Sequence, residues 1–257
     1  MPALDWLTAR PIAHRGLHDA SAVENTASAF SAAIAGGYGI ECDLQVSADG
    51  EAMVHHDDAL GRLTEGSGRL ADLSAAEIKK VRFKQGNDRI LTLAELCELV
   101  AGRATLVLEL KSRFDGDRRL VERAAAVLAN YTGPVAAMSF DPAMVEVLRH
   151  IAPGVTRGIV AERHYAHHEW NRMPPGDKRR LAFLLHAPRT RPQFVAYAVR
   201  DLPALAPLAA RLCGLPLLTW TVRSEADRAR AARWADQMIF EGWRPLDGQR
   251  RPCHAAN

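Results

Sequence analysis

Short apolar segments alternate with helix-like segments along this chain of 257 residues, and the alternation predicts an α/β fold. The strand-like segments begin near residues 11, 39, 106, 135, 156, 194, 217 and 238. Most are followed by a helix-like segment, which is the pattern of a parallel sheet. Eight such units in a chain of this length predict a TIM (β/α)8 barrel. An open, doubly wound sheet is a weaker alternative because no G-x-G-x-x-G motif follows an early strand.

Residues typical of strand and helix ends predict the bounds of the first two strands and of the helix between them. The strand Ile12-Ala13 stops at His14-Arg15-Gly16. A helix is expected next, with Asn25 as its N-cap and Gly36-Gly37 at its end. The second strand is expected to span Tyr38 to Val46, before a turn that contains Gly50.

Residues 52–90 do not follow the alternation and are expected to form a small insertion after the second strand. Ala52 to His56 reads as a return strand, and the glycine-rich stretch Asp57 to Arg69 reads as a loop. Helical segments are expected at about 74–82 and 92–100. We therefore expect residues 1–257 to form a single barrel domain that carries this insertion.

From residue 106 onward the alternation is regular except for one stretch. The expected strands are 106–110, 135–140, 156–161, 194–199, 217–222 and 238–240, and the expected helices are 117–131, 142–151, 202–213 and 225–235. Residues 162–180 are rich in histidine, proline and charge, and they are expected to form a loop excursion.

The composition excludes several classes of protein. Apolar residues make up 48% of the chain and charged residues 25%, as in ordinary globular proteins. A net charge of +3 is too small to indicate a nucleic-acid partner. No apolar run approaches the ~20 residues of a membrane helix, and Met1 to Arg10 lacks the pattern of a signal peptide. The cysteines Cys42, Cys97, Cys213 and Cys253 are isolated, so a cytoplasmic location is expected; the oligomeric state stays open.

Carboxylates gather near the ends of the early strands, where a TIM barrel carries its active site. Side chains two residues apart share one face of a strand, so Glu41 lies beside Asp43, and Glu109 beside Lys111. Three carboxylates this close would raise one another's pKa, so a bound cation is expected. Ligation by oxygen alone favours Mg²⁺ or Ca²⁺ over zinc.

Two histidines and an arginine complete the predicted rim. His14 ends the first strand and His56 ends the return strand, so both can flank the same cation. Imidazoles that titrate near neutrality suit a general acid and a general base. Arg15 offers a planar donor fork that matches phosphate oxygens. Together these groups indicate hydrolysis of a phosphate ester.

The ordered motifs of this chain resemble those of the glycerophosphodiester phosphodiesterase family. They are H-R-G at 14–16, E-N-T at 24–26, E-x-D at 41–43, H-D-x-x-L-x-R at 56–62 and E-x-K at 109–111, with looser matches at 139–141 and 220–222. The resemblance implies a metal-dependent enzyme that hydrolyses glycerophosphodiesters to sn-glycerol 3-phosphate and an alcohol. It implies a cation held by Glu41, Asp43 and Glu109, an acid/base pair of His14 and His56, and phosphate contacts from Arg15 and Lys111.

Some choices stay open at this point. The chain does not identify the head group, the preferred ion, or which histidine is the acid. A lysophospholipase D that acts on lysolipids is the alternative enzyme, and a non-catalytic barrel that binds phosphate-containing ligands is the alternative binder. The non-catalytic barrel is disfavoured because a protein that only binds phosphate needs no acid/base pair.

Trp220 is expected to form the floor of the glycerol pocket, and packing inside the barrel is the alternative role for this residue. Near the last strand the family tends to show T-D-x-P, whereas this chain has Phe240-Glu241-Gly242-Trp243-Arg244-Pro245.

The other polar residues near these motifs are expected to support the structure or to face solvent. Glu24 is expected to support the site indirectly. Asp57 and Asp58 could extend the metal site, but solvent is the usual partner of turn acids and is the expected one here. His55 is expected to point away from His56. The histidines His164, His167 and His168 lack cysteine partners and are read as a solvated surface.

Overall fold

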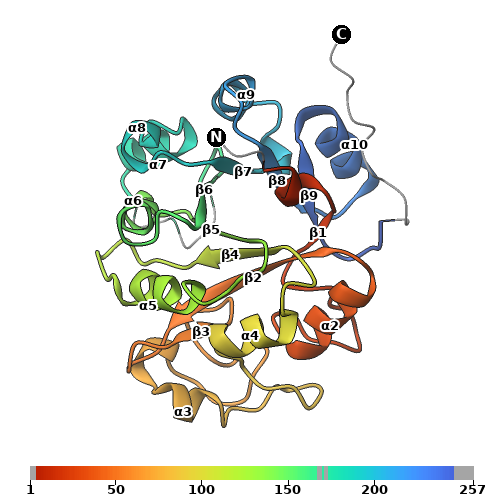
Figure 1. The fold of residues 1–257 in the computed structure, drawn as a ribbon, viewed down its shortest axis with the longest axis vertical. Helices are drawn as coiled ribbons and strands as arrows, with labels where there is room; N and C mark the ends of the chain where they lie inside the picture. The colour runs from red at the N-terminus through yellow and green to blue at the C-terminus, as the bar shows by residue number, and fades with distance from the viewer. Residues whose placement is uncertain (1–3, 167–169, 171–172, 246–257) are drawn as a thin grey trace.

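A computed structural model describes residues 4–166, 170 and 173–245 of the chain. Within these residues eight parallel strands close into a barrel, and Figure 1 shows their arrangement. The barrel strands are β1 (Ile12–Ala13), β2 (Gly39–Val46), β4 (Leu106–Leu110), β5 (Val135–Ser139), β6 (Thr156–Ala161), β7 (Phe194–Ala198), β8 (Leu217–Val222) and β9 (Gln237–Phe240). Closure occurs at β1, which pairs in parallel with both β2 and β9. The predicted TIM barrel is therefore confirmed.

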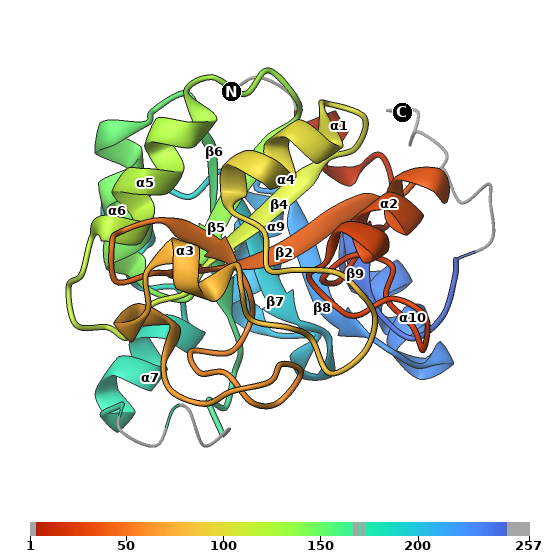
Figure 2. The same ribbon diagram turned by 90° about the horizontal axis from the view of Figure 1, so that it is seen from below.

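Helices surround the barrel on its outside (Figure 2). They are α2 (Ala27–Ala35), α4 (Leu93–Val100), α5 (Arg119–Leu128), α6 (Pro142–Ile151), α7 (Pro175–Ala182), α8 (Ala187–Thr190), α9 (Leu205–Leu212) and α10 (Glu225–Trp234), with a 3-10 turn, η3 (Val199–Asp201), after β7. The short helix α1 (Asp5–Thr8) precedes β1, and its Leu7 packs with the apolar side chains inside the barrel. Side-chain caps fix several starts: Thr92 and Ser224 form capping boxes, and Asp141 caps α6. Residues 162–180 were expected to be loop, but α7 occupies their end, with Pro175 at its first position.

One predicted cap is wrong. Thr26, not Asn25, caps α2, because its hydroxyl accepts a hydrogen bond from the backbone N–H of Ala29. Asn25 instead adopts a left-handed conformation with φ 58°. Asparagine tolerates that conformation better than most residues. The turn frees the Asn25 side chain for a contact described below.

The chain between β2 and α4 packs at one end of the barrel, seen at the foot of Figure 1. There β3 (Ala52–Val54) pairs antiparallel with β2, and η1 (Leu70–Asp72) and α3 (Ala75–Ile78) follow. Its buried apolar cluster consists of Met53, Leu70, Ile78, Phe83 and Ile90. The assignment of the whole chain to a single domain stays a prediction.

Apolar side chains fill the barrel and the layer between strands and helices. The interior cluster contains Leu7, Ile12, Val107, Ala136, Met138, Val160, Phe194, Ala196, Leu218 and Ile239. Glycine is required at Gly158, because a Cβ there would overlap the ring of Phe194 on the neighbouring strand. No helix in the described part of the chain combines the length and the apolar character needed to cross a bilayer.

Candidate active site

Three carboxylates converge where β2 and β4 run side by side. Asp43 pairs with Glu109 in the register of these strands, and Glu41 lies two residues before Asp43. One oxygen atom from each of Glu41, Asp43 and Glu109 lies within 4.8 Å of the others. All three side chains are buried, with exposed fractions of 1%, 1% and 8%. The strands thus bring together the three acids that the sequence predicted to be neighbours.

Two cations lie against this cluster. Lys111 Nζ is 2.9 Å from Asp43 Oδ1 and 2.6 Å from Glu109 Oε1. Arg15 Nε is 3.1 Å from Asp43 Oδ2. Burial alone would raise the pKa of Asp43, but Lys111 and Arg15 hold it well below its usual range. Burial alone would lower the pKa of Lys111, but Asp43 and Glu109 raise it.

The donor chemistry of the cluster fits a hard divalent cation. Burial, followed by the charges of Asp43 and Glu109, raises the pKa of Glu41 well above its usual range. A third buried negative charge is unfavourable at this place. Carboxylate oxygens are the ligands that Mg²⁺ and Ca²⁺ prefer. The cluster could therefore hold a metal ion.

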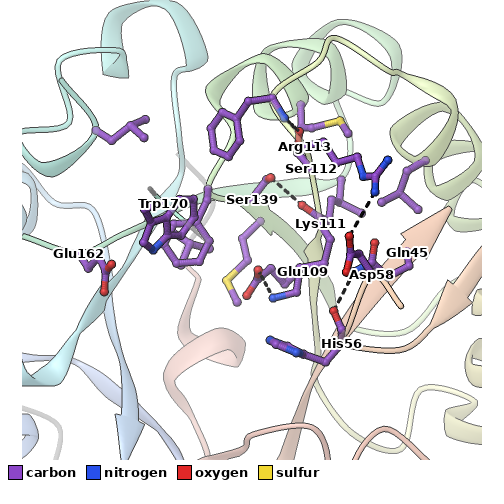
Figure 3. Close-up of a pocket in the computed structure, with 18 of the residues that line it drawn as sticks. Gln45, His56, Asp58, Glu109, Lys111, Ser112, Arg113, Ser139, Glu162 and Trp170 are labelled. Carbon is purple, nitrogen blue, oxygen red and sulfur yellow. Dashed lines mark hydrogen bonds and ion pairs between the residues drawn. The ribbon is translucent and has the colours of Figure 1, made fainter. Parts of the chain in front are cut away.

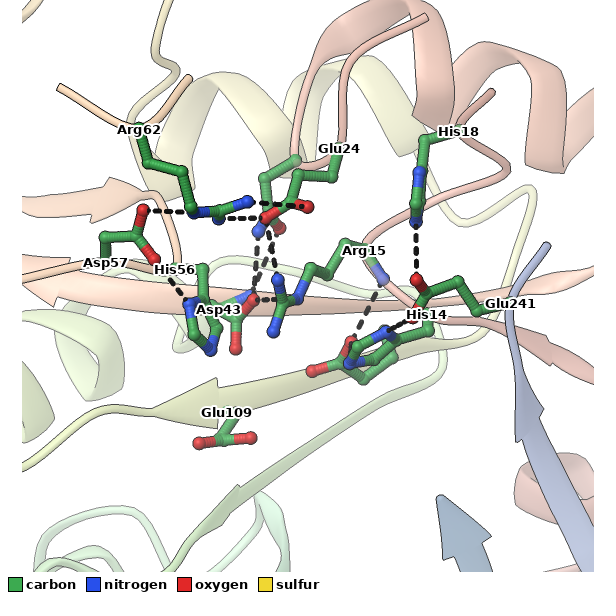
Figure 4. Close-up of polar contacts among 12 residues, drawn as sticks. His14, Arg15, His18, Glu24, Asp43, His56, Asp57, Arg62, Glu109 and Glu241 are labelled. Carbon is green, nitrogen blue, oxygen red and sulfur yellow. Dashed lines mark hydrogen bonds and ion pairs between the residues drawn. The ribbon is translucent and has the colours of Figure 1, made fainter. Parts of the chain in front are cut away.

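His14 is positioned by β1 and by the adjacent strand β9. Ala13 pairs with Phe240, so the next residues, His14 and Glu241, lie side by side. Figure 4 shows their contact, in which His14 Nδ1 is 2.6 Å from Glu241 Oε2. Arg223 also donates to this oxygen, at 2.8 Å. The other ring nitrogen, Nε2, faces the cluster, 3.9 Å from Glu41 Oε2.

The pKa values of His14 and Glu241 are both shifted from their usual range. Burial lowers the pKa of His14 to about 4, although the hydrogen bond with Glu241 acts to raise it. Burial alone would raise the pKa of Glu241, but His14 and Arg223 lower it to about 2. No role was predicted for Glu241 from the sequence. The predicted barrel could have indicated its position, because closure of a barrel places the end of the last strand, with Glu241, beside the end of the first strand, with His14.

His56 is held in the same way from the opposite side of the cluster (Figure 4). Its Nδ1 lies 2.8 Å from Asp57 Oδ1, and Arg62 Nε donates to Asp57 Oδ2 at 2.6 Å. Burial would raise the pKa of Asp57, but His56 and Arg62 hold it below its usual range. The expectation that Asp57 meets solvent is therefore wrong. His55, which is only 2% exposed, is packed inside the molecule.

Residues around the cluster link its parts. Glu24 accepts hydrogen bonds from Arg15 at 2.7 Å and from Arg62 at 2.6 Å, so it bridges the two arginines. Asn25 donates through Nδ2 to Asp43 Oδ2 at 2.9 Å. Glu24 thus supports the site indirectly, as expected, whereas Asn25 orients a carboxylate of the cluster.

A cavity of about 2520 Å³ opens over the cluster. His14, Arg15, Glu41, His56, Glu109, Lys111 and Trp220 all line it. Trp220 has a buried Nε1 atom for which the described residues supply no hydrogen-bond acceptor. Figure 3 shows Trp170 and Glu162 on one side, with Glu109, Lys111 and His56 on the other. His164 lies apart with a 66% exposed side chain, and His167 and His168 fall outside the described residues.

Comparison with protein families finds one match over most of the chain. The model of the glycerophosphoryl diester phosphodiesterase family matches residues 14–242. A glycerophosphodiester phosphodiesterase of Caldanaerobacter subterraneus subsp. tengcongensis is 33% identical over an alignment of 159 residues. The match covers 58% of this chain and 65% of the relative. Glycerophosphodiester phosphodiesterase 1 of Rattus norvegicus is 36% identical over an alignment of 115 residues, and the match covers 40% of this chain. The match spans only 34% of that relative.

Solved structures share the fold. A phosphodiesterase of Oleispira antarctica, in complex with the product sn-glycerol-3-phosphate, superposes with a TM-score of 0.75 and 21% identity. The superposition covers 90% of this chain and 91% of that one. A glycerophosphodiester phosphodiesterase described as putative, from Galdieria sulphuraria, has a TM-score of 0.73 at 22% identity and covers 90% and 92% of the two chains. These likenesses establish the barrel.

Proposed function

The chain belongs to the glycerophosphoryl diester phosphodiesterase family, and on this premise we propose that it hydrolyses glycerophosphodiesters to sn-glycerol 3-phosphate and an alcohol with the help of a divalent cation. The observation that carries the proposal is one arrangement: three buried carboxylates within 4.8 Å of one another, flanked by two histidines that are each anchored through Nδ1. A binding protein would need the charge but not the paired histidines.

The binding roles follow from charge and position. Glu41, Asp43 and Glu109 would hold Mg²⁺ or Ca²⁺, whose positive charge stabilises negative charge that develops on the phosphate oxygens. Arg15 and Lys111 lie beside these acids and would contact the phosphate. Trp220 would floor the glycerol pocket. A cytoplasmic location remains a further proposal, which rests on the isolated cysteines.

Proton transfer would be divided between the two histidines. With Nδ1 directed to a carboxylate, each ring leaves Nε2 for the substrate. One histidine takes a proton from the attacking oxygen, of water or of a glycerol hydroxyl, as that oxygen bonds to phosphorus. The other gives a proton to the alcohol oxygen as its bond to phosphorus breaks. A hydroxyl attack leaves a cyclic phosphate, which water then opens by the same transfers.

The test is release of sn-glycerol 3-phosphate from glycerophosphocholine by the purified chain. We expect activity to disappear with EDTA and to return when Mg²⁺ or Ca²⁺ is added back. Glu41→Gln should lose most activity, and calorimetry should show weaker metal binding, because the variant removes one carboxylate ligand. Glu98→Gln, an exposed acid on α4, is the matched control.

Two outcomes would contradict the proposal. Full activity in EDTA would remove the cation from the reaction. Absence of turnover on every diester tried, despite measurable metal and phosphate binding, would favour the non-catalytic barrel.

A further inference from the structure

A surface that is both basic and apolar lies at the end of α7 and in the turn that follows it. Residues 178–191 contain no acid and five basic residues, which are Lys178, Arg179, Arg180, Arg189 and Arg191. Between the two groups of basic residues, Phe183 is 48% exposed and Leu185 is 64% exposed. We call five exposed residues of this stretch the α7–α8 surface: Arg179, Arg180, Phe183, Leu185 and Arg189.

The turn after α7 keeps the apolar side chains of this surface exposed. The backbone N–H of Leu184 donates to Leu181 O at 3.0 Å, and that of Leu185 donates to Arg180 O at 3.0 Å. This pair of bonds is a Schellman turn, whose left-handed position is usually a glycine. Here Leu184 occupies that position with φ 55°, and its side chain is buried. A leucine in this conformation is unfavourable, so its burial offsets the strain and anchors the turn that holds Phe183 and Leu185 at the surface.

The positive charge of the α7–α8 surface is only partly neutralised. Arg180 Nη1 lies 3.6 Å from Asp177 Oδ1, and Arg189 Nε lies 2.9 Å from Glu146 Oε2. Both arginine side chains are more than half exposed, and exposed ion pairs contribute little to stability. Arg179 forms no ion pair with a described residue. An anionic partner can therefore engage all three guanidinium groups.

The α7–α8 surface adjoins the entrance of the cavity over the carboxylates. Arg180, Leu185 and Arg189 belong both to this surface and to the lining of the cavity. Arg179 and Phe183 do not line it, and the Arg179 guanidinium lies 6.0 Å from the centroid of the Phe183 ring. Figure 2 shows α7 at the edge of the molecule, and Figure 1 and Figure 2 both place it on the opposite side from α10. A partner that covers this surface would thus contact the protein beside the candidate active site.

The combination of side chains distinguishes between classes of anionic partner. A nucleic-acid duplex would use the arginines, because its binding is dominated by phosphate contacts, but it would not need the exposed Phe183 and Leu185. A bilayer with anionic lipids uses both kinds of side chain. Apolar side chains enter the boundary between headgroups and acyl chains, and arginines contact the lipid phosphates. The chemistry of the surface therefore fits an anionic bilayer.

We propose that the α7–α8 surface docks this protein reversibly on bilayers that contain anionic lipids. Docking would set the entrance of the cavity beside the lipid headgroups. The inference goes beyond the proposed function and does not depend on it, because binding to a bilayer requires no turnover.

The experiment measures how the full chain, loaded with Mg²⁺, sediments with vesicles of two compositions. One is phosphatidylcholine alone, and the other is a three-to-one mixture of phosphatidylcholine and phosphatidylserine. We expect at least about tenfold tighter binding to the anionic vesicles, because several basic residues act together near the negative surface. This binding should weaken at least about tenfold when NaCl is raised from about 0.1 M to 1 M, because the Debye length shortens.

Two variants connect the binding to the surface. Arg179→Gln should weaken binding to the anionic vesicles about fivefold, because it removes one positive charge. Phe183→Ala should weaken it at least about threefold, because it removes apolar area that enters the bilayer. The matched controls are Arg233→Gln on α10, whose guanidinium also lies over a ring, and Leu212→Ala, which is 90% exposed at the end of α9. Both surface variants should keep the melting temperature and the turnover of glycerophosphocholine, because neither residue lines the cavity.

Several results would overturn the docking surface: equal binding to the two kinds of vesicle, no binding to either, or equal effects of the surface variants and their controls. Binding to duplex DNA and to vesicles that depends on Arg179 but not on Phe183 would identify a general polyanion surface, and would overturn it as well. Absence of turnover in the wild-type protein would refute the proposed function, whereas the vesicle measurements would still decide the docking surface.

Discussion

Replacement of Glu241 by glutamine tests whether this residue positions His14 for proton transfer. Glu241 Oε2 lies 2.6 Å from His14 Nδ1 and accepts a hydrogen bond from Arg223 at 2.8 Å. A carboxylate only accepts hydrogen bonds, so it requires a proton on Nδ1 and keeps the Nε2 of the neutral ring unprotonated. An amide can also donate to Nδ1, which would place the ring proton on Nε2.

The size of the effect follows from the lost interaction. A hydrogen bond to a charged group contributes about 1.5–3 kcal/mol. If that stabilisation is lost only in the transition state, kcat falls about 10- to 150-fold. KM should change less than about threefold, because Glu241 does not hold the phosphate in the proposed arrangement.

The assay is steady-state release of sn-glycerol 3-phosphate at saturating metal, together with ¹⁵N NMR of the His14 ring. Wild type should show Nδ1 protonated, and Glu241→Gln should show a mixture of the two tautomers. Glu225→Gln, at an 84% exposed side chain on α10, is the matched control. A folded Glu241→Gln variant with kcat within about twofold of wild type would refute the positioning role. An unchanged kcat with a raised KM would show that Glu241 binds substrate instead.

Three further changes have expected outcomes. His14→Asn and His56→Asn should each lower kcat about 10²- to 10⁴-fold with little change in melting temperature, whereas His164→Asn should not; a near-normal rate would remove that histidine from the mechanism. Gly16→Ala should destabilise the fold by ~2 kcal/mol or more in urea unfolding, because Gly16 has φ +80° and a Cβ would lie 2.9 Å from Ala29. Gly50→Ala should lower the free energy of unfolding by less, because Gly50 has a similar φ of +83° but open space around it. Equal losses of stability in the two variants would show that the contact with Ala29 is not the cause. Burial lowers the pKa of His186 from 6.5 to about 4, so its contribution to stability is present above pH 6.5 and is lost as pH falls toward 4. Between about pH 7 and pH 4.5 the unfolding free energy should fall by ~2–3 kcal/mol more in wild type than in His186→Gln, and parallel curves would refute this.

The barrel could be predicted from sequence because its signals are local. Each strand lies close to its expected position, since apolar runs such as 106–110 and 194–198 are bounded by polar residues and capped helices. The neighbouring acids were predictable as well. Glu41 and Asp43 share a strand face by the period of two, and adjacency of β2 and β4 brings Glu109 to them.

Local signals misassigned residues whose partners are distant. Asn25 has the residue type of a helix cap, yet its side chain binds Asp43 across 18 positions. Asp57 has the residue type of a solvent-facing turn acid, yet it joins His56 to Arg62. In both cases the choice depends on where a side chain meets another element, which no short window of sequence contains.

The sequence by itself therefore determined the order of strands and helices, the membership of the carboxylate cluster and the candidate histidines. Only the tertiary structure decided what surrounds them. Barrel closure brings Glu241 to His14 across 227 positions. The loops after β4 and β6 bring Phe114 and Trp170 into contact with each other, and Trp170 also packs against Phe140, the residue after β5. The physical reason is that periodicity fixes the face on which a side chain lies, whereas its partners depend on how distant segments pack once the ring of strands has closed.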